Sequence, residues 1–540
     1  MMGATGTIQA TQKKVMVMVG AVILMMLLAL SGCDGNDTAD TTNGDHNGYE
    51  NGENGENGTN GENGPVTLTV GFEGEAFNLD PHMSLIMANV QVFAQSYDTL
   101  VRVGADGELV PVLATSWERS DDYSYTFFLR EGVMFHNGEE MTADDVAFSM
   151  RRGAESPGVA AIMGVFDPER IEVVDRYTVR IGTHQNFAPL VETLTHPAAA
   201  VLSQSAYEAG VDFENEIVGT GAFAMIDRVH GDFIEFEAFD DYHGGRAAVD
   251  RLVIRPIVEL NSRMVALEAG EIDIANLSRT NIPAIEANDD LQLLTRDNYQ
   301  IFYLGINVDN VPDVRVRRAI NYAINTAEIH EILLYGQGAP LDGPLTPEVF
   351  GAHPDLDGFE FNPEQALELL AEAGYDASNP LELTLVTNEF GDRLEWAQAA
   401  QANLATIGVT LHISQYETAV FLEETANANY DMFVLAWTTV TGDADYGLFP
   451  LFHSSNHGAP GNRTFFANER VDYLLDLARN SFDEEVRLTA YLEVQEIIME
   501  EAPMVFLASG SVMMSARNNV HGLEPTPTSI PMFHNVYFSD

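Results

Sequence analysis

The chain contains a single cysteine, Cys33, among its 540 residues. One cysteine forms no internal disulfide and builds no cysteine-rich metal site, so the fold must rest on buried apolar side chains. Hydrophobic residues make up 46% of the chain, which is typical of globular proteins. At about 100–200 residues per domain, the length predicts roughly two to four domains or lobes.

The sequence before Cys33 has the pattern of an export signal. Lys13 and Lys14 precede an uncharged apolar run over residues 15–30, which is the order of the basic and apolar regions of a signal peptide. The run is shorter than the ~20 residues that a bilayer-spanning helix needs. The segment Leu30-Ser31-Gly32-Cys33, with small residues directly before the cysteine, resembles the lipobox of bacterial lipoproteins. That resemblance implies a signal peptide over 1–32 and a lipid on Cys33. The alternative is an ordinary signal anchor with an incidental cysteine.

Residues 33–64 are predicted to form a flexible tether. After Cys33 the segment is dominated by Asn, Gly, Asp, Glu and Thr, with the sequence NGEN repeated. It offers almost no apolar surface to bury, which is typical of chains that do not fold. Lipid, tether and folded body together predict a protein held at the outer face of a membrane. No other apolar run in the chain reaches the length of a membrane span.

The charge balance is strongly acidic. Lys and Arg number 26 against 82 Asp and Glu, for a formal net charge of −56. Such a field repels phosphate backbones, so the chain is not expected to bind nucleic acid. The acids are spread along the chain, which favours a solvated surface suited to a saline or alkaline exterior. A cation-collecting surface is the alternative.

The folded body shows both strand and helix patterns. Alternating or β-branched runs predict strands, and capping signals predict helix starts such as Thr142 to Asp145. Beyond residue 306, strands at 381–386 and 409–411 flank a helix at 394–407, which indicates an α/β arrangement with a mixed or parallel sheet. The last 25 residues, rich in proline, are expected to pack back onto the first part of the body.

Motifs for catalysis or cofactor binding are weak. Residues 219–224 match GxGxxA, but the sequence that follows is strand-like, whereas a nucleotide-binding turn is followed by a helix. His453 and His457 are four residues apart within a Ser-, Asn- and Gly-rich segment, which does not favour a shared helix face for a metal. His330-Glu331 lacks the second histidine of HExxH, and no serine lies in GxSxG. We therefore predict no enzymatic activity, no metal and no cofactor.

Several segments, in order along the chain, resemble bacterial extracellular solute-binding proteins of family 5, the peptide, dipeptide and nickel receptors of ABC importers. The segments are Leu79-Asp80-Pro81, Tyr97-Asp98-Thr99-Leu100-Val101, Leu113-Ala114-Thr115-Ser116-Trp117-Glu118, the stretch 128–146, Val218-Gly219-Thr220-Gly221-Ala222-Phe223, Gly270-Glu271-Ile272-Asp273, Val314-Arg315-Val316-Arg317-Arg318-Ala319 and Leu369-Leu370-Ala371-Glu372-Ala373-Gly374-Tyr375. The most specific resemblance is the stretch 128–146, from Phe128 through Asn137-Gly138 to Val146.

The resemblance implies an α/β, two-lobed periplasmic-binding-protein-like fold of type II, cluster C, with a two-strand hinge. The first lobe would comprise 65–305 plus 510–540, with 109–214 as an extra subdomain. The second lobe would comprise 306–509, and the solute would be enclosed between the lobes.

The segment 435–446 resembles the one that carries the pocket tryptophan of the family, which Trp437 matches. An aspartate three residues later usually pairs with the α-ammonium of a peptide, but here that residue is Val440. We therefore expect the charge of the solute to be met elsewhere, with Asp443 and Arg393 as candidates; a structural role for Asp443 and Asp445 is the alternative. The full set of predicted ligand-binding residues is Trp437, Ala436, Thr438, Thr439, Asp443 and Arg393 with, facing them from the first lobe, Phe77 and Asn78.

The function that the resemblance implies is the substrate-binding subunit of an ABC importer for short peptides or peptide-like solutes. The expected partners are the solute, the permease subunits and the membrane through the lipid on Cys33, and a monomer is expected. A nickel-chelate or oligosaccharide receptor of the same fold, and a surface enzyme or chaperone that reuses the fold, remain alternatives.

Overall fold

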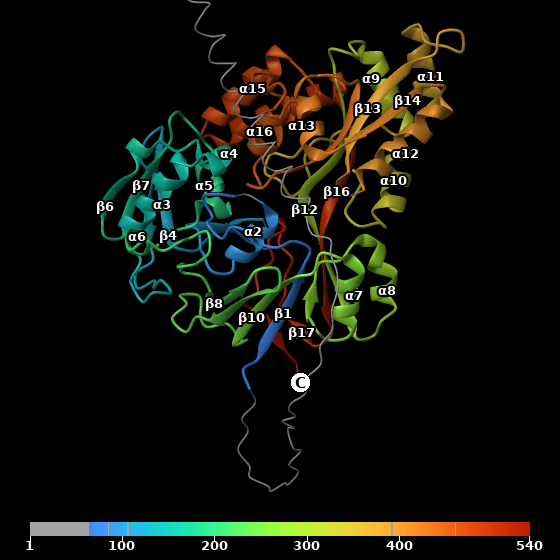
Figure 1. Cartoon of the computed structure of the whole chain (residues 1–540). Helices are drawn as coiled ribbons and strands as arrows, with labels where there is room; N and C mark the ends of the chain where they lie inside the picture. The colour runs from blue at the N-terminus through green and yellow to red at the C-terminus, as the bar shows by residue number, and fades with distance from the viewer. Residues whose placement is uncertain (1–63, 85, 105–106, 390–391, 460, 540) are drawn as a thin grey trace, which may run out of the picture. The chain divides into compact units, whose positions relative to one another are not determined.

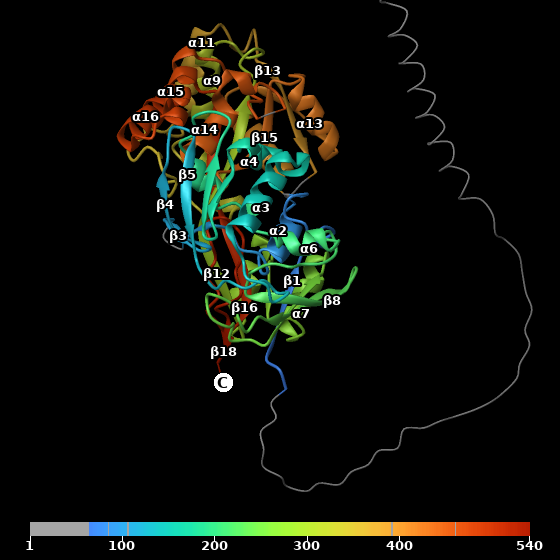
Figure 2. The same ribbon diagram turned by 90° about the vertical axis from the view of Figure 1, so that its left-hand side faces the viewer.

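A ten-stranded mixed sheet runs through the body (Figures 1 and 2). The computed structural model describes residues 64–84, 86–104, 107–389, 392–459 and 461–539. The strand order is β14-β13-β15-β12-β16-β11-β1-β10-β9-β8, so segments far apart in the sequence are neighbours. The strands are β1 (Thr67–Phe72), β8 (Phe223–Val229), β9 (Phe233–Ala238), β10 (Arg251–Pro256), β11 (Ile274–Ala275), β12 (Leu291–Ile306), β13 (Glu382–Asn388), β14 (Thr410–Tyr416), β15 (Met432–Thr438) and β16 (Met504–Arg517).

The two long strands β12 and β16 connect the two ends of this sheet, as Figure 2 shows. They pair antiparallel, with a shift in register between Asp297 and Ile301. On one side of the shift β11 pairs with β16 at Ser515 and Ala516, and on the other side β15 pairs with β12 from Gln300 onward. We call the part built on β11, β1, β10, β9 and β8 the first lobe. The part built on β13, β14 and β15 is the second lobe.

The first lobe buries an apolar core between its sheet, helix α2 (Met87–Phe93) and the end of the chain. After β16 the chain forms the short pair β17 (Val520–His521) and β18 (Tyr537–Phe538), and Phe533 and Val536 are fully buried in this core. The side chain of Gln95 donates a hydrogen bond to Pro531 O at 2.8 Å and accepts one from Phe533 N at 3.2 Å. The prediction that the last residues pack back onto the first part of the body is confirmed. Helices α7 (Leu260–Glu268) and α8 (Ile282–Glu286) enclose a smaller core beside β11.

An additional unit within the first lobe has its own antiparallel sheet, in the order β4-β5-β7-β6, and its own core. Its predicted bounds, 109–214, stay a prediction. The predicted cap at Thr142 is confirmed, because Thr142 N donates to Asp145 Oδ2 at 2.9 Å where α3 begins. The elements of this extra subdomain are β4 (Ala114–Arg119), β5 (Ser124–Leu129), β6 (Glu172–Asp175), β7 (Thr178–Gly182), α3 (Ala143–Glu155), α4 (Ala160–Met163), α5 (Leu190–Thr193) and α6 (Gln204–Glu208), while β2 (Val101–Val103) and β3 (Leu109–Pro111) form a separate hairpin before it.

Helices cover both faces of the sheet in the second lobe (Figure 1). On one face lie α9 (Val314–Ala323), α10 (Thr326–Leu333), α11 (Pro363–Glu372) and α12 (Arg393–Thr406), and on the other α13 (Thr418–Ala426), α14 (Ala444–Phe452), α15 (Glu469–Asn480) and α16 (Glu484–Glu501). β13 runs parallel to both β14 and β15. The mixed α/β arrangement predicted for this part of the chain is confirmed.

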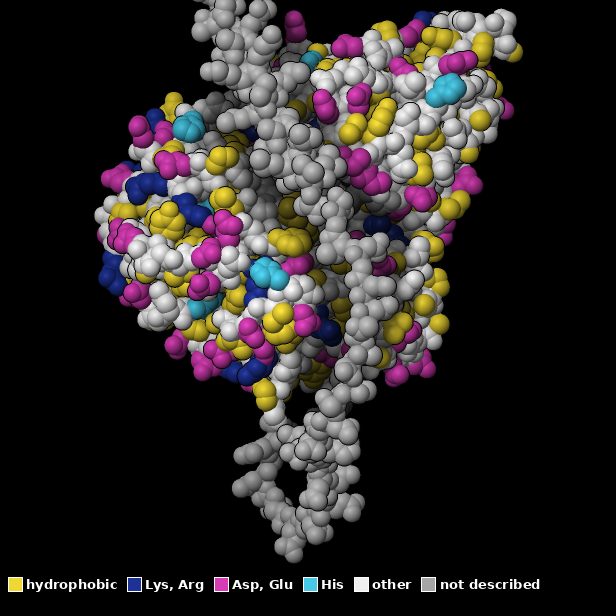
Figure 3. All heavy atoms as spheres, viewed as in Figure 1, with side chains coloured by type: hydrophobic (Ala, Val, Ile, Leu, Met, Phe, Trp, Pro, Cys, Tyr) yellow, Lys and Arg dark blue, Asp and Glu magenta, His cyan; other side chains and the backbone are white. Residues whose placement is uncertain are grey.

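The acidic side chains are spread over the body on the face drawn in Figure 3 rather than gathered in one patch. A search of the described residues for a helix both long enough and apolar enough to cross a membrane finds none. The predicted signal peptide, Cys33 and almost all of the tether fall within residues 1–63, outside the described residues.

Candidate functional site

The loop between β15 and α14 lies where the second lobe meets the extra subdomain. β15 ends at Thr438, and α14 begins at Ala444; the side chain of Asp443, directly before it, caps the helix by accepting a hydrogen bond from Asp445 N at 2.9 Å. The intervening loop carries Val440, and the first turn of α14 carries Tyr446. Both side chains pack against the core of the extra subdomain. This loop therefore brings the two lobes into contact.

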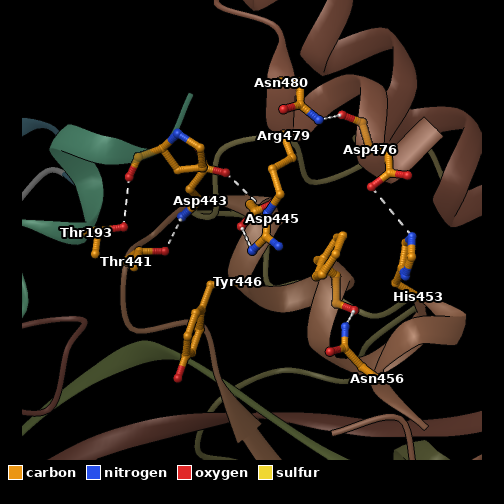
Figure 4. A network of polar contacts seen from close by, with 12 residues as sticks. Thr193, Thr441, Asp443, Asp445, Tyr446, His453, Asn456, Asp476, Arg479 and Asn480 are labelled. Carbon is orange, nitrogen blue, oxygen red and sulfur yellow. Dashed lines mark hydrogen bonds and ion pairs between the residues drawn. The ribbon is translucent and has the colours of Figure 1, made fainter. Parts of the chain in front are cut away.

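Two buried ion pairs hold the end of this loop against α15 and α16. The carboxylate of Asp443 accepts two hydrogen bonds from Arg487, at 2.6 and 2.7 Å, and both side chains are almost completely buried. Asp445 is held by both Nε and a terminal nitrogen of Arg479, at 3.0 and 2.9 Å (Figure 4). Charge-assisted pairs of this geometry are strong and directional. In Figure 4 the ring of Tyr446 points to the other side of the loop, away from Arg479.

Glu192, on α5 of the extra subdomain, adds a third carboxylate to this interface. Its Oε2 is buried and has no hydrogen-bond partner among the described residues. Burial raises the pKa of Glu192 to about 7, and the negative charge of Asp443 adds to the effect. Burial likewise raises the pKa of Asp443, while the guanidinium of Arg487 opposes that shift. The interface therefore contains a carboxyl group that titrates near neutral pH.

Direct contacts also join α15 and the turn after it to the extra subdomain. Ala188 N donates to Arg479 O at 2.8 Å, and the side chain of Asn186 donates to Asn480 O at 3.0 Å. The guanidinium of Arg119 lies 3.7 Å from the ring centre of Phe482, a distance at which a cation is attracted to an aromatic face. The two lobes thus touch through hydrogen bonds and an aromatic contact as well as through the loop.

A cavity of about 270 Å³ opens beside this interface. The first lobe contributes one face of α2, residues within 97–103 and within 195–200, and the side chains of Val112 and Ile162. The second lobe contributes Val440 and Tyr446, and the end of the chain contributes residues within 526–532. The walls are mostly apolar. A concave, mostly apolar site with a few polar groups between two lobes is typical of small-molecule binding.

The charged groups at the cavity come from the segment that follows α2. Asp98 accepts a hydrogen bond from Thr220 at 3.1 Å, and its Oδ2 lies 2.9 Å from Nε2 of His243. Arg102, on β2, also lines the cavity and is half-buried. The arrangement can bind a solute of modest size through apolar walls and a small number of charged or hydrogen-bonding groups.

A family model described as bacterial extracellular solute-binding proteins, family 5 Middle, matches residues 108–459, more than half of the chain. The chain belongs to this family. The family consists of solute-binding proteins, and its description as extracellular agrees with the export signal predicted from the sequence.

Individual relatives and a solved structure agree with this membership. The solute-binding protein is 30% identical over 476 residues to Heme-binding protein A of Haemophilus influenzae, covering 82% of this chain and 86% of the relative. It is 30% identical over 504 residues to Di/tripeptide-binding protein 2 of Pseudomonas aeruginosa, covering 87% and 95%. The structure of the periplasmic binding protein DppA from Helicobacter pylori in complex with the peptide STSA matches with a TM-score of 0.74, 27% identity, and coverage of 88% and 99%. The predicted two-lobed fold is confirmed.

The predicted ligand residues of the second lobe are neighbours of a lining residue but do not themselves belong to the described lining of the cavity. Nε1 of Trp437 donates to Tyr446 O at 2.9 Å, and the two ring centres lie 5.5 Å apart, so Trp437 packs on a residue that lines the cavity. Thr438 accepts a hydrogen bond from the side chain of Gln300 at 3.3 Å, and Thr439 is buried. Direct contacts of Trp437, Ala436, Thr438 and Thr439 with a solute stay predictions.

The other predicted ligand residues also lie outside the described lining of the cavity. Asp443 is held by a buried guanidinium, which favours the structural role that the sequence left open. Arg393 begins α12 and donates to Asn388 at 3.0 Å, and burial lowers its pKa. The side chain of Phe77 is 70% exposed, and Asn78 accepts a hydrogen bond from Asp80 N at 2.8 Å. None of these four belongs to the described residues that line the cavity, and their solute contacts also stay predictions.

Sequence reasoning missed the main wall of the cavity. Met87, Val90 and Ala94 of the α2 region, together with Arg102, were not selected as site residues. A signal was present, because the segment beginning at Tyr97 stands out as a family signature. The sequence did not reveal that this signature forms part of a cavity, since the opposite walls lie several hundred residues away.

The weak motifs have structural explanations. A Cβ atom on Gly219 would lie 2.0 Å from Ser96 O, so the glycine is required by a close backbone approach, and strand β8 follows it instead of a helix. His453 is stacked on Phe449 with ring centres 4.4 Å apart, and Nε2 of His457 lies 2.9 Å from Phe466 O. Among the residues that the structure describes, no group of three or more His, Cys, Asp and Glu could hold a metal ion.

Proposed function

We propose that this chain is the substrate-binding subunit of an ABC importer that captures short peptides or peptide-like solutes outside the membrane, without catalysis. The observation that carries the proposal is the apolar cavity walled by both lobes. A solute that contacts both lobes favours the closed arrangement by its differential affinity, which is how a hinged receptor couples binding to closure. Family membership and the named di/tripeptide-binding relative support peptides as the solute class. A closed, loaded receptor would then deliver its solute to the permease subunits.

We further propose that the lobes follow the predicted bounds, 65–305 with 510–540 and 306–509. The shift in register between β12 and β16 near Asp297 supports a hinge close to these limits, because a break in regular pairing is a point where two strands can bend. A monomer is proposed for the working receptor.

Anchoring through Cys33 is proposed from the sequence. Cys33→Ser should leave the folded body unchanged and release it from membranes. Cell fractionation and intact-mass measurement of the exported protein test this. A mutant that stays in the membrane fraction, together with a wild-type mass that lacks a lipid, would contradict the proposal.

The solute class is tested by titration calorimetry of the purified body with the dipeptide Met-Leu, the tetrapeptide Ser-Thr-Ser-Ala and heme, the last because one relative is named for it. Native mass spectrometry of the protein as purified identifies any solute that it carries. Val440→Trp fills the cavity and should weaken peptide binding at least tenfold, whereas Val420→Trp, on an exposed position of α13, should leave it unchanged. Binding of heme alone, or recovery of cleaved peptides, would refute the proposal.

A further inference from the structure

Arg102 is a cation at the cavity wall. It is half-buried on β2, and its guanidinium makes no hydrogen bond or ion pair with any residue that the structure describes. Two other half-buried arginines are neutralised: Arg152 pairs with Asp80, and Arg479 pairs with Asp445. A guanidinium beside an apolar cavity loses hydration when the cavity fills, and a negatively charged partner offsets that loss most strongly.

The neighbours of Arg102 do not supply that partner. His534, from the end of the chain, is close enough for the charge of Arg102 to act on it, and burial together with that charge lowers the pKa of His534. A neutral imidazole offers no negative charge. Asp98 is the acidic residue among the described lining residues, and it already accepts a hydrogen bond from Thr220 and contacts His243. Among the described residues, Arg102 therefore has no hydrogen-bonded counter-ion, and a solute carboxylate would supply one.

The opposite wall offers no carboxylate to a solute ammonium group. The second lobe presents Val440 and Tyr446 to the cavity, and the nearest carboxylates on that loop, Asp443 and Asp445, are bound to arginines. A cation buried against these two side chains would have no counter-charge, whereas an apolar group would pack well there. The cavity is thus basic at one point, apolar over most of its surface, and without an unengaged carboxylate.

We propose that Arg102 binds a carboxylate of the solute, and that the solute is a small apolar acid whose amino group is dispensable for binding. The inference rests on the proposed function in taking a peptide as the reference solute, and it extends that function by assigning which end of the peptide is recognised. A guanidinium binds a carboxylate through two parallel hydrogen bonds, so it sets the orientation of the solute as well as its charge. The apolar walls then receive one or two uncharged side chains.

The test compares four probes by calorimetry: Met-Leu, its C-terminal amide, N-acetyl-Met-Leu and N-acetyl-leucine. Each is titrated into the wild-type body, Arg102→Gln, Arg102→Lys and the matched control Arg255→Gln. Arg255, on β10, lies outside the described lining of the cavity, and its replacement by Gln removes the same charge as Arg102→Gln does. Circular dichroism and thermal unfolding establish that each variant is folded.

In the wild type, amidation of the C-terminus should weaken binding about 10- to 100-fold, the usual effect of losing a charged hydrogen-bond partner. Acetylation of the N-terminus should change it less than threefold. Arg102→Gln should weaken Met-Leu binding to the level of the amide and leave the amide unaffected. Arg102→Lys, which keeps the charge but loses the planar fork, should give an intermediate loss, and Arg255→Gln should match the wild type.

The two proposals fail differently. If Met-Leu binds and Arg102→Gln binds it as tightly as the wild type does, or if acetylation weakens binding more than amidation, the role of Arg102 is wrong while the peptide receptor stands. If N-acetyl-leucine binds in an Arg102-dependent manner and no dipeptide binds, the peptide class is wrong while the role of Arg102 stands. If none of the four probes binds to the wild type, both are overturned.

Discussion

Replacing Asp443 by Asn should destabilise the body by about 3–5 kcal/mol, because it leaves the buried guanidinium of Arg487 without a counter-charge. Asn retains the ability to cap α14, so the change removes charge and leaves the helix start intact. The exposed fractions of the two side chains are 2% for Asp443 and 9% for Arg487, and Asp443 accepts two hydrogen bonds of 2.6 and 2.7 Å. Removing one member of a buried pair leaves an uncompensated charge, which sets the expected magnitude.

The matched control is the exposed pair of Arg119 and Asp122, whose side chains are 38% and 71% exposed. Asp122→Asn should cost less than about 1 kcal/mol, since solvent screens such pairs. Adding Arg487→Met to Asp443→Asn should recover about 1–3 kcal/mol, because the stranded cation is replaced by an apolar group of similar length. Equilibrium unfolding in urea, followed by fluorescence and circular dichroism, measures the wild type and all three variants. A loss in Asp443→Asn no larger than in Asp122→Asn, or a double variant less stable than the single one, would refute the reasoning.

Three further predictions follow from the same interface and its surroundings. The folded-state pKa of Glu192, about 7, lies above its ordinary value of 4.5, so the folded state loses stability as the pH rises from about 4.5 through 7. The unfolding free energy of Glu192→Gln should equal that of the wild type at pH 4 and exceed it at pH 8, by at most about 3 kcal/mol. A difference that stays constant over this pH range would contradict the assignment. Gly219→Ala should destabilise by at least about 2 kcal/mol in urea unfolding, because the new Cβ would meet Ser96 O at 2.0 Å, and a neutral effect would show that the backbone approach is not required. In calorimetry, Tyr446→Ala should weaken peptide binding more than Trp437→Ala does, because Tyr446 lines the cavity whereas Trp437 contacts Tyr446. The reverse order would place the solute against Trp437.

Local features of the fold were predictable because their causes are local. A hydroxyl and a carboxylate three residues apart, as in Thr142 and Asp145, can satisfy backbone amides wherever they occur, and α3 begins there. The pattern of apolar residues likewise gave the strand predicted at 381–386 and the helix predicted at 394–407, which lie within two residues of the ends of β13 and α12.

The candidate site was less predictable because its partners are distant in the sequence. Nothing in the residues around Asp443 indicates that Arg487 approaches it, so a buried structural pair and a solute contact looked equally reasonable. Similarly, whether the face of Trp437 is open to a solute depends on the position of Tyr446, which follows the turn into α14. Arg102 was overlooked because a lone arginine in a strand carries no local signal of function; its meaning comes from the cavity around it.

The contacts between the lobes and the groups in the cavity have separate consequences for binding. The hydrogen bond from Ala188 to Arg479 and the stacking of Arg119 on Phe482 lie outside the cavity lining, so they favour closure to the same extent whatever the solute is. Such contacts set the fraction of receptor in the binding-competent arrangement, and they scale the affinity for every solute alike. Discrimination between solutes must then come from the cavity itself, where Arg102 presents charge and Val440 presents an apolar surface. An acidic protein surface and a guanidinium at the cavity wall are therefore compatible: the surface governs solubility, whereas Arg102 acts only over the short distance at which a carboxylate can reach it.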